Sequence, residues 1–410
     1  MRILIVTQYF YPEQFRINDI CKELVKRGNQ VTVLTGLPNY PDGNIYSGYE
    51  KSYLNIDDYY GATVYRCKLR PRLKGAKNLA LNYLSFVIQA NRKAKEIRQD
   101  FDIIYVYGLS PITIALPAIK IGKKCKAPIA YYCLDIWPES VRDANNGRML
   151  MSKKNPIFLC AKLISIYIYR HMDWIGTKCK EFVDYITKEC HVPEKKLSVI
   201  PEHAEDVYLR AAEKPIDNGT FDIVFLGNLG KTQNCNQMIQ SLSEIKEKND
   251  IVLHFVGDGS EKENLIKQAQ LLGIEHQVQF HGHYPIHETI KFYDMADVCI
   301  LALSSETTTG MTPPGKLYGY MAAGRGVIAA IDGAGKRLIE CSKCGICVKP
   351  DNVSDLKDAI IWAANNKDAM VEKGMQGRAY FINNLTLKKH VDELEKQFKI
   401  MLYENKNAEF

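Results

Sequence analysis

The sequence lacks any run of about eighteen uncharged apolar residues, the length that a helix needs to cross a bilayer. It also lacks a basic leader followed by an apolar stretch and a small-residue cleavage site, because the N-terminus opens directly on the apolar run Arg2–Thr7. Neither a spanning helix nor a secretory leader is expected. We therefore expect this chain of 410 residues to stay in the cytoplasm.

The fourth cysteine of an iron–sulfur ligand run is missing as well. Cys341, Cys344 and Cys347 are each separated by two residues, but no cysteine follows them shortly afterwards. The other cysteines among the twelve are scattered, often inside apolar segments, as Cys21 and Cys133 are. We expect them to be reduced, buried, structural thiols.

The net charge is small, +7, but it is unevenly distributed. Between Arg66 and Arg98, ten Lys and Arg residues stand against a single acid, Glu96. Such a block is typical of proteins that meet nucleic acid or a membrane surface, and the alternative is a merely solvated basic face. Because no recognisable nucleic-acid-binding module accompanies the block, we expect no nucleic acid and favour a membrane surface.

Short apolar, β-branched runs alternate with helical patterns along the whole chain, which predicts parallel sheets covered by helices on both faces. The strands expected in the first half are Arg2–Thr7, Gln30–Thr35, Asp102–Tyr107, Pro128–Cys133, Trp174–Thr177 and Leu197–Ile200. After the polar segment Glu202–Gly219 the pattern restarts, with strands expected at Phe221–Leu226, Ile251–Val256, Val278–His281, Val298–Ala302 and Val327–Ala330.

We therefore predict an α/β chain of two doubly wound, Rossmann-like domains, at residues 1–203 and 204–385. An amphipathic helix within residues 386–410 has Val391, Leu394 and Phe398 on one stripe and is expected to pack back toward the N-terminal domain. Two open sheets joined by a linker leave a cleft between the carboxyl ends of their strands, where ligands bind. Functional motifs are thus expected directly after strands.

Two loops of the second half suit phosphate. The strand Phe221–Leu226 runs into Gly227–Gln233 just before a helix. Glycines permit close backbone approach, the helix start offers N–H groups and Lys231 adds a positive charge, which together suit a diphosphate. A plain turn with a surface lysine is the alternative. The polar loop Ser304–Lys316 also precedes a helix and suits a second phosphate cradle, with Lys316 facing the first.

Two loops of the first half carry more side-chain chemistry than a connection needs. The loop Gln8–Arg16 leaves the first strand with four aromatic residues and a charged pair, a combination that suits sugars. The loop Leu134–Ser140 places Asp135 and Glu139 four residues apart beside a tryptophan, where carboxylates suit the orientation of sugar hydroxyls or the stabilisation of an oxocarbenium ion. A glycosidase pair and plain structural packing are the alternatives.

These motifs resemble those of the family 4 glycosyltransferases, and more narrowly the branch of the N-acetyl-L-fucosamine transferases of capsule and O-antigen synthesis. The segments that carry the likeness are Val6–Ile20, Leu34–Gly43, Asp135–Ser140, Gly227–Gln233 and Pro314–Gly324. The resemblance implies a GT-B fold, with the nucleotide sugar on the C-terminal domain and the acceptor on the N-terminal domain. It also implies a retaining reaction in which the departing diphosphate takes the acceptor's proton and cationic side chains do what a metal does elsewhere.

The residues that we expect to act follow from these loops and from the resemblance. Catalytic roles are expected for Asp135, Glu139, Lys231 and Lys316. Donor-binding residues are expected to be Gly227, Asn228, Gly230, Lys231, Gln233, His283, Tyr284, Met311, Thr312, Pro313, Pro314 and Lys316. Acceptor-binding residues are expected to be Tyr9, Tyr11, Glu13, Arg16, Asn39 and Tyr40. No carboxylate pair has the spacing of a Mg²⁺ or Mn²⁺ site, so neither a metal nor another cofactor is expected.

The chain departs from the family pattern at three places. Met311 and Gly319 stand where many members carry two glutamates, the second of which binds the donor ribose. Asn228 stands where the family has an arginine, and the histidine often found after the third or fourth strand has no counterpart around Tyr107–Pro111. The diphosphate site itself is retained.

The expected activity is transfer of a sugar from a UDP-sugar to a lipid-linked saccharide acceptor, in bacterial capsular or O-antigen polysaccharide biosynthesis. On the resemblance, the sugar is an N-acetylated amino sugar. The basic and aromatic segments Arg66–Arg98 and Arg148–Arg170 are expected to hold the enzyme peripherally at the inner face of the plasma membrane. The alternatives are a sugar-nucleotide epimerase of the same architecture and a non-catalytic partner in a polysaccharide-synthesis complex.

Overall fold

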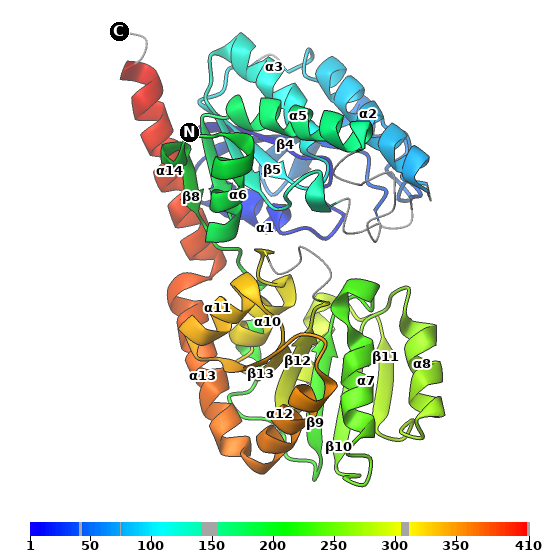
Figure 1. Ribbon diagram of the computed structural model, residues 1–410. Coiled ribbons are helices and arrows are strands. Elements are labelled where there is room, and N and C mark those ends of the chain that lie inside the picture. Colours follow the sequence, from blue (N-terminus) through cyan, green and yellow to red (C-terminus); the bar gives the residue numbers. More distant parts are fainter. Residues whose placement is uncertain (41–42, 74, 98, 141–154, 305–310, 408–410) are drawn as a thin grey trace. The chain divides into compact units, whose positions relative to one another are not determined.

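The computed structural model describes residues 1–40, 43–73, 75–97, 99–140, 155–304 and 311–407 (Figure 1). The chain divides into two compact units. The first unit is Met1–Pro201 together with His390–Phe410, and the second unit is Glu202–Lys389. Each unit is built around one sheet.

The first unit contains an eight-stranded sheet in the order β3-β4-β2-β1-β5-β6-β7-β8. Its strands are β1 (Arg2–Val6), β2 (Gln30–Gly36), β3 (Ile56–Tyr59), β4 (Ala62–Cys67), β5 (Ile103–Gly108), β6 (Ile129–Cys133), β7 (Trp174–Thr177) and β8 (Leu197–Val199). β3 runs antiparallel to β4, whereas the other neighbouring pairs are parallel. The central strand β5 is buried along its whole length, as expected of a strand covered on both faces.

Five helices flank this sheet in the described residues, and three of them have a recognisable cap at one end. They are α1 (Ile17–Lys26), α2 (Ala76–Lys93), α3 (Ala115–Cys125), α5 (Pro156–Arg170) and α6 (Lys180–Cys190). The side chain of Asn155 accepts a hydrogen bond from the Ile157 N–H at 2.8 Å, and Pro156 occupies the first turn of α5. Lys126 and His191 end α3 and α6 in the left-handed conformation.

The C-terminal helix α14 (Leu387–Asn407) belongs to the first unit from His390 onward. Its stripe of Val391, Leu394 and Phe398 is fully buried, and the Phe398 ring lies 5.5 Å from the Tyr105 ring of β5. At the polar edge of the helix, Glu395 accepts a hydrogen bond from Asn29 Nδ2 at 2.7 Å. The helix is therefore part of the apolar core of this unit.

The second unit contains a six-stranded, wholly parallel sheet in the order β11-β10-β9-β12-β13-β14. Its strands are β9 (Phe221–Leu226), β10 (Ile251–Val256), β11 (Val278–Gly282), β12 (Val298–Ala302), β13 (Gly326–Ala330) and β14 (Gly345–Val348). Its helices are α7 (Cys235–Ser243), α8 (Lys262–Leu271), α9 (Ile290–Met295), α10 (Gly315–Ala322), α11 (Gly333–Ser342), α12 (Val353–Asn365) and α13 (Lys367–Asn384).

Apolar clusters cover both faces of the second sheet. One cluster takes residues from α7, α8 and α12, and the other takes residues from α9, α10, α11 and α13. Helices on both faces of a parallel sheet define a doubly wound α/β unit. The prediction of two Rossmann-like, parallel-sheet units is thereby confirmed.

The predicted strands are all present, with ends within one residue of the prediction. The hairpin of β3 and β4 was not predicted, because the polar residues of β3 break the apolar pattern. All twelve cysteines are free, as expected. Cys160 and Cys341 are exposed, however, and Cys125 and Cys347 are half-buried, so the expectation of buried thiols is wrong for these four.

Candidate functional site

The carboxyl ends of β9 and β10 meet in two glycine turns. Gly227 follows β9 and Gly257 follows β10, each with a φ of 144°. The Gly227 N–H donates to the Val256 carbonyl at 2.9 Å. A Cβ on Gly257 would lie 2.0 Å from the Gly227 carbonyl oxygen, and a Cβ on Gly227 would lie 3.3 Å from the Lys316 Nζ. Glycine thus allows the two turns to touch and keeps the backbone of the first turn close to a cation.

Lys316 joins the two predicted phosphate loops. It lies in the first turn of α10, and its ammonium group donates to the side-chain oxygen of Gln233 at 2.5 Å. The same ammonium lies 3.6 Å from the centre of the Phe225 ring. Burial lowers the pKa of Lys316 to about 7. An anion that arrives beside such a lysine restores its charge and gains a strong electrostatic contact.

The other predicted residues of the first loop lie at its rim. Lys231 begins the short 3₁₀ turn Lys231–Gln233 between β9 and α7, and its side chain is exposed. Asn228 is exposed as well, and its Nδ2 would lie 2.7 Å from a Cβ on Gly230. The structure therefore brings Gly227, Gln233 and Lys316 together, with Lys231 and Asn228 on the exposed side of the same loop.

The second predicted loop ends at the start of α10. Met311, Thr312 and Pro313 directly precede the helix, and Pro314 is its N-cap residue with an extended backbone. The Ser304 N–H donates to the Thr232 carbonyl at 3.3 Å, which ties the loop after β12 to the loop after β9. Residues 305–310 of the predicted loop lie outside the described residues.

His283 and Tyr284 follow β11, at the same edge of the sheet. The Gly257 N–H donates to the Gly282 carbonyl at 2.8 Å, which links this turn to the turn after β10. The Tyr284 ring packs against Phe292 at 5.0 Å between ring centroids, whereas the His283 side chain is exposed. Both residues are therefore placed two strands away from Gly227.

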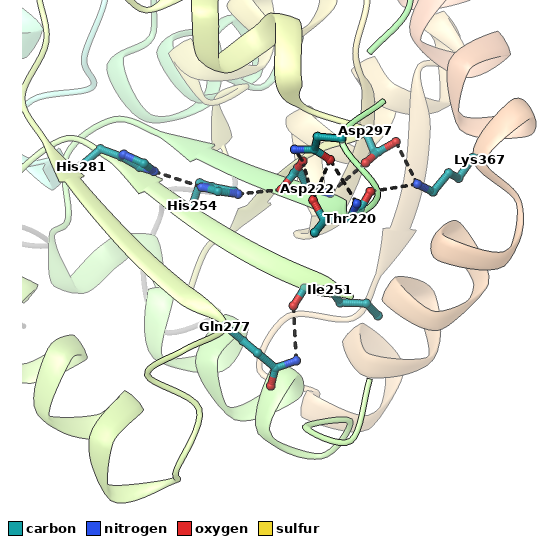
Figure 2. A network of polar contacts seen from close by, with 9 residues as sticks. Thr220, Asp222, Ile251, His254, Gln277, His281, Asp297 and Lys367 are labelled. Atoms are coloured by element: carbon teal, nitrogen blue, oxygen red, sulfur yellow. Dashed lines mark hydrogen bonds and ion pairs between the residues drawn. The ribbon is translucent and has the colours of Figure 1, made fainter. Parts of the chain in front are cut away.

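A buried polar network crosses three strands of the same sheet (Figure 2). His254 of β10 lies with its Nε2 2.8 Å from Asp222 Oδ1 of β9 and its Nδ1 3.0 Å from His281 Nε2 of β11. Asn218 and Thr220 donate to the other oxygen of Asp222 at 2.8 and 3.0 Å. Burial opposes ionisation of Asp222, but the hydrogen bonds from His254 and Asn218 outweigh it, so its pKa is lowered. We did not predict this network, whose signal is a polar residue inside each apolar strand.

In the first unit, Glu13 is a buried structural clamp. Its Oε1 accepts hydrogen bonds from the N–H groups of Asn39 and Tyr40 at 2.9 and 2.8 Å, and its Oε2 accepts one from Phe10 N–H at 3.2 Å. Burial raises the pKa of Glu13 to about 7, although these backbone bonds favour the ionised form. The carboxylate thus holds the loop after β1 against the loop after β2.

The clamp supports a cluster of three aromatic rings and one cation. Tyr9 stacks on Phe15 with centroids 5.3 Å apart, and Tyr40 lies 5.6 Å from Tyr9 and 5.3 Å from Phe15. The Arg72 guanidinium lies 5.0 Å from the Tyr40 ring and donates to the Tyr9 hydroxyl at 3.3 Å. Asn39 fixes the Arg72 backbone by accepting from its N–H at 3.0 Å. We did not predict Arg72 as an acceptor-site residue, because it lies within the basic block.

The remaining predicted acceptor residues lie elsewhere on the same loop. The Tyr11 side chain is exposed and packs against Tyr59 of β3 at 5.0 Å between centroids. Its carbonyl accepts a hydrogen bond from Arg66 Nη2 at 2.7 Å. Arg16 is the N-cap residue of α1 and is half-buried. The aromatic cluster therefore combines Tyr9, Tyr40 and the Asn39 backbone, but not the Tyr11 ring.

Asp135 and Glu139 follow β6 and have different environments. Glu139 is buried, and its Oε1 accepts from Lys162 Nζ of α5 at 3.3 Å and from the Tyr185 hydroxyl of α6. Asp135 is half-buried, and its charge acts on the phenol of Tyr83, as does that of Arg72. Glu139 is thus committed to an internal network, and Asp135 is the carboxylate near the aromatic cluster.

No group of three His, Cys, Asp or Glu that could hold a metal ion is found among the described residues. The Lys316 ammonium and the exposed Lys231 are cations that the structure places beside these glycine turns. The arrangement can stabilise a diphosphate electrostatically.

Two family models match the chain, one in each half. Residues 15–202 match the model described as Glycosyltransferase Family 4, and residues 210–379 match the model described as Glycosyl transferases group 1. A curated relative is the alpha-monoglucosyldiacylglycerol synthase of Streptococcus pneumoniae. It is 23% identical over 414 residues, which span 96% of this chain and 85% of that protein.

Solved structures share the fold over nearly the whole chain. HepE from Anabaena, in complex with UDP, has a TM-score of 0.71 at 14% identity and covers 97% of this chain and 100% of its own. Sucrose-phosphate synthase from Thermosynechococcus elongatus has a TM-score of 0.75 at 12% identity and covers 98% of this chain and 99% of its own. At these identities the likeness shows the fold alone.

Proposed function

Since the chain belongs to the two-domain GT-B glycosyltransferases, with a family 4 domain followed by a group 1 domain, we propose that it moves a sugar from a UDP-sugar to a lipid-linked saccharide acceptor. The observation that carries the donor part is the contact of Lys316 with Gln233 beside Gly227, at the carboxyl ends of the strands. The UDP and UDP-glucose complexes of HepE support a uridine nucleotide.

The proposed mechanism relies on the cationic side chains of Lys316 and Lys231. As the bond between sugar and diphosphate breaks, negative charge grows on the leaving diphosphate. The Lys316 ammonium stabilises this charge at close range, and Lys231 reaches it from the exposed side of the loop. The acceptor hydroxyl oxygen then bonds to the anomeric carbon on the face that the diphosphate leaves, and its proton passes to the diphosphate, so that configuration is retained. The remaining work of the protein is positioning.

For the acceptor, we propose the aromatic cluster with Arg72, in which Tyr40 is the exposed ring and the buried Tyr9 supports it. Aromatic faces pack on the apolar faces of sugar rings, and a guanidinium suits a phosphate group. A lipid acceptor is supported by the name of the pneumococcal relative, a glucosyldiacylglycerol synthase. The N-acetylated amino sugar and the role in capsular or O-antigen polysaccharide synthesis are proposed on the sequence resemblance.

We also propose that the first unit binds peripherally to the inner face of the plasma membrane, without inserting a spanning helix. No helix within the described residues is long and apolar enough to cross a membrane. Helices α2 and α5 instead carry exposed apolar side chains, which are Leu84, Ile88, Ile157, Leu159, Leu163, Ile164 and Tyr167. Arg70, Lys77 and Arg92 are exposed cations on or next to α2. Apolar insertion and attraction to anionic lipid reinforce one another on such a surface.

Part of the basic block does not contribute to this surface. Arg66 is buried and pairs with Asp57 at 2.7 Å, and Lys93 is buried with its ammonium 2.8 Å from the Tyr53 carbonyl. Phe86 and Ala90 of α2 also point inward. Residues 148–154 of the second predicted segment lie outside the described residues. The proposed surface therefore rests on the outer faces of α2 and α5.

The donor proposal is tested by nucleotide binding and transfer in the presence of EDTA. UDP should raise the Tm of the protein without divalent metal, and EDTA should leave transfer to membrane lipids intact. A panel of UDP-sugars, with lipid-linked products identified by mass spectrometry, names the sugar. Strict dependence of transfer on Mg²⁺ or Mn²⁺ would contradict the proposed mechanism.

A further inference from the structure

An apolar groove lies on the first unit between α2, α5 and the 3₁₀ turn Ile112–Ile114. Its volume is about 570 Å³, and its lining includes Tyr83, Val87, Leu116, Trp137 and Leu163. None of the described residues that line it is charged. Both α2 and α5 pack on the 3₁₀ turn, so the groove is framed by elements that hold one another in place. Its size and apolar walls are those of a ligand site.

One end of the groove borders the aromatic cluster. Asn82, next to Tyr83 in α2, accepts a hydrogen bond from Gln8 Nε2 at 2.7 Å, and Gln8 directly precedes Tyr9. Asn82 also donates to the Arg70 carbonyl at 2.5 Å, two residues before Arg72. The groove and the proposed acceptor site therefore share the hydrogen-bonded junction between α2 and the loop after β1.

We propose that the groove seats one hydrocarbon chain of the lipid-linked acceptor, whose anionic and saccharide head lies at Arg72 and the aromatic cluster. This inference rests on the proposed function and adds the part of the protein that holds the lipid. The arrangement matches the shape of an amphiphile. A cation with aromatic rings lies at one end, and the apolar groove follows it. Seating the chain fixes the head group at the reaction site, which lowers the entropy cost of transfer.

The groove is part of the membrane-binding surface, since Leu84, Leu163, Ile164 and Tyr167 belong to both, but it differs from the rest of that surface in what it recognises. A flat surface needs a bilayer, whereas a groove binds a single amphiphile in solution. Burial of a chain from water stabilises by about 0.8 kcal/mol per CH₂ group, so a chain of moderate length suffices for measurable binding. A monomeric probe therefore separates the two modes of lipid contact.

The probe is dodecyl phosphate with bromine at the end of its chain, used with the full-length protein below the micelle concentration. Bromine quenches indole fluorescence at short range, and Trp137 lines the groove. We expect saturable quenching that disappears in Trp137→Phe, leaving the emission of Trp174 and Trp362 unquenched.

A matched pair of substitutions on α5 tests the place of binding. Leu163 lines the groove and its side chain is 67% exposed, whereas Leu159 is 50% exposed and does not line the groove. Leu163→Asp should weaken quenching by about tenfold or more, because a carboxylate at an apolar wall is costly to desolvate. Leu159→Asp, with the same change of charge, should bind the probe as the wild type does.

Two results would overturn the inference. One is the absence of Trp137 quenching by the monomeric probe, and the other is equal loss of quenching in the two α5 variants. Either result leaves the donor proposal standing if UDP still raises the Tm and transfer persists. Conversely, quenching without any UDP binding would support the groove and count against the proposed function.

Discussion

Lys316 and Lys231 belong to the same proposed diphosphate site but have different environments. Lys316 is packed on Phe225 and bonded to Gln233, and Lys231 is exposed on the 3₁₀ turn. We expect Lys316→Ala and Lys231→Ala each to cost about 2–4 kcal/mol in kcat/KM, the amount lost when one charged donor to a developing anion is removed. Lys246→Ala, at an exposed position after α7, is the control. A kcat/KM near that of the wild type in both Lys316→Ala and Lys231→Ala would mean that the diphosphate binds elsewhere.

The pKa of Lys316 predicts that donor binding takes up a proton. In the free protein burial lowers this pKa to about 7, and a bound diphosphate raises it again by favouring the ammonium. Above pH 7 the site must therefore gain a proton on binding, and the Kd for UDP-glucose should rise with pH by up to about tenfold per unit. Below pH 7 the lysine is already charged and the Kd should level off.

Calorimetry in buffers of different ionisation enthalpy measures this proton directly. UDP-glucose is used as the ligand in place of UDP, because its diphosphate has no terminal phosphate that would itself titrate in this pH range. The Lys316→Met variant removes the titrating amine and should show no uptake. Identical uptake in the variant and the wild type at pH 8 would assign the proton to another group.

At the scale of elements, the network of Asp222, His254 and His281 joins three neighbouring strands. Asp222→Ala should lower the free energy of unfolding by about 1–3 kcal/mol at pH 7, because it leaves a buried imidazole without its acceptor. His276→Ala, at an exposed histidine, is the control, and its change in the free energy of unfolding should be near zero. Scanning calorimetry measures both.

The pH dependence of this effect has a definite sign. The pKa of Asp222 in the folded protein is lowered from its ordinary value of 3.8. The contribution of Asp222 to the free energy of unfolding is therefore fully present above the ordinary value. It is lost as the pH falls through the pKa of the folded protein. The difference in Tm between wild type and Asp222→Ala should be constant near neutrality and shrink under acid conditions. An unchanged difference down to pH 3 would contradict an ionised Asp222.

The strands were predictable, whereas the partners of the loop side chains were not. Apolar, β-branched runs mark parallel strands locally, and the glycine turns after them are visible in the sequence. Lys231 and Lys316 were identified in this way. The engagement of Glu13 with the backbone of Asn39 and Tyr40, and of Arg72 with Tyr9, joins residues far apart in the chain. Such pairings depend on how the loops pack, which no local pattern encodes.

At the scale of the molecule, binding to vesicles should rise with the fraction of anionic lipid and fall at high salt. Lys74 lies outside the described residues and Arg72 contacts Tyr9, so we choose the exposed cations Arg70, Lys77 and Arg92 of the proposed surface for neutralisation to Gln. Removal of each positive charge should weaken the free energy of binding to anionic vesicles by about 1 kcal/mol. The matched control neutralises three exposed lysines of the second unit, Lys246, Lys267 and Lys349.

Co-sedimentation with vesicles measures this binding. Equal weakening by the two triple substitutions would indicate a general effect of charge and not a surface on the first unit. A wild-type protein that stays in the supernatant with anionic vesicles at low salt would rule the surface out.

Because α14 packs on the first unit, the second unit can finish folding before the first during synthesis. The second unit is continuous from Glu202 to Lys389, so its sheet and helices are all available before the last helix leaves the ribosome. The first unit, although translated first, lacks Val391, Leu394 and Phe398 until the whole second unit has been made. Its nascent sheet must therefore keep an apolar strip uncovered while the second unit folds, which is the kind of surface that chaperones bind. A chain that stops before His390 would leave that strip permanently exposed.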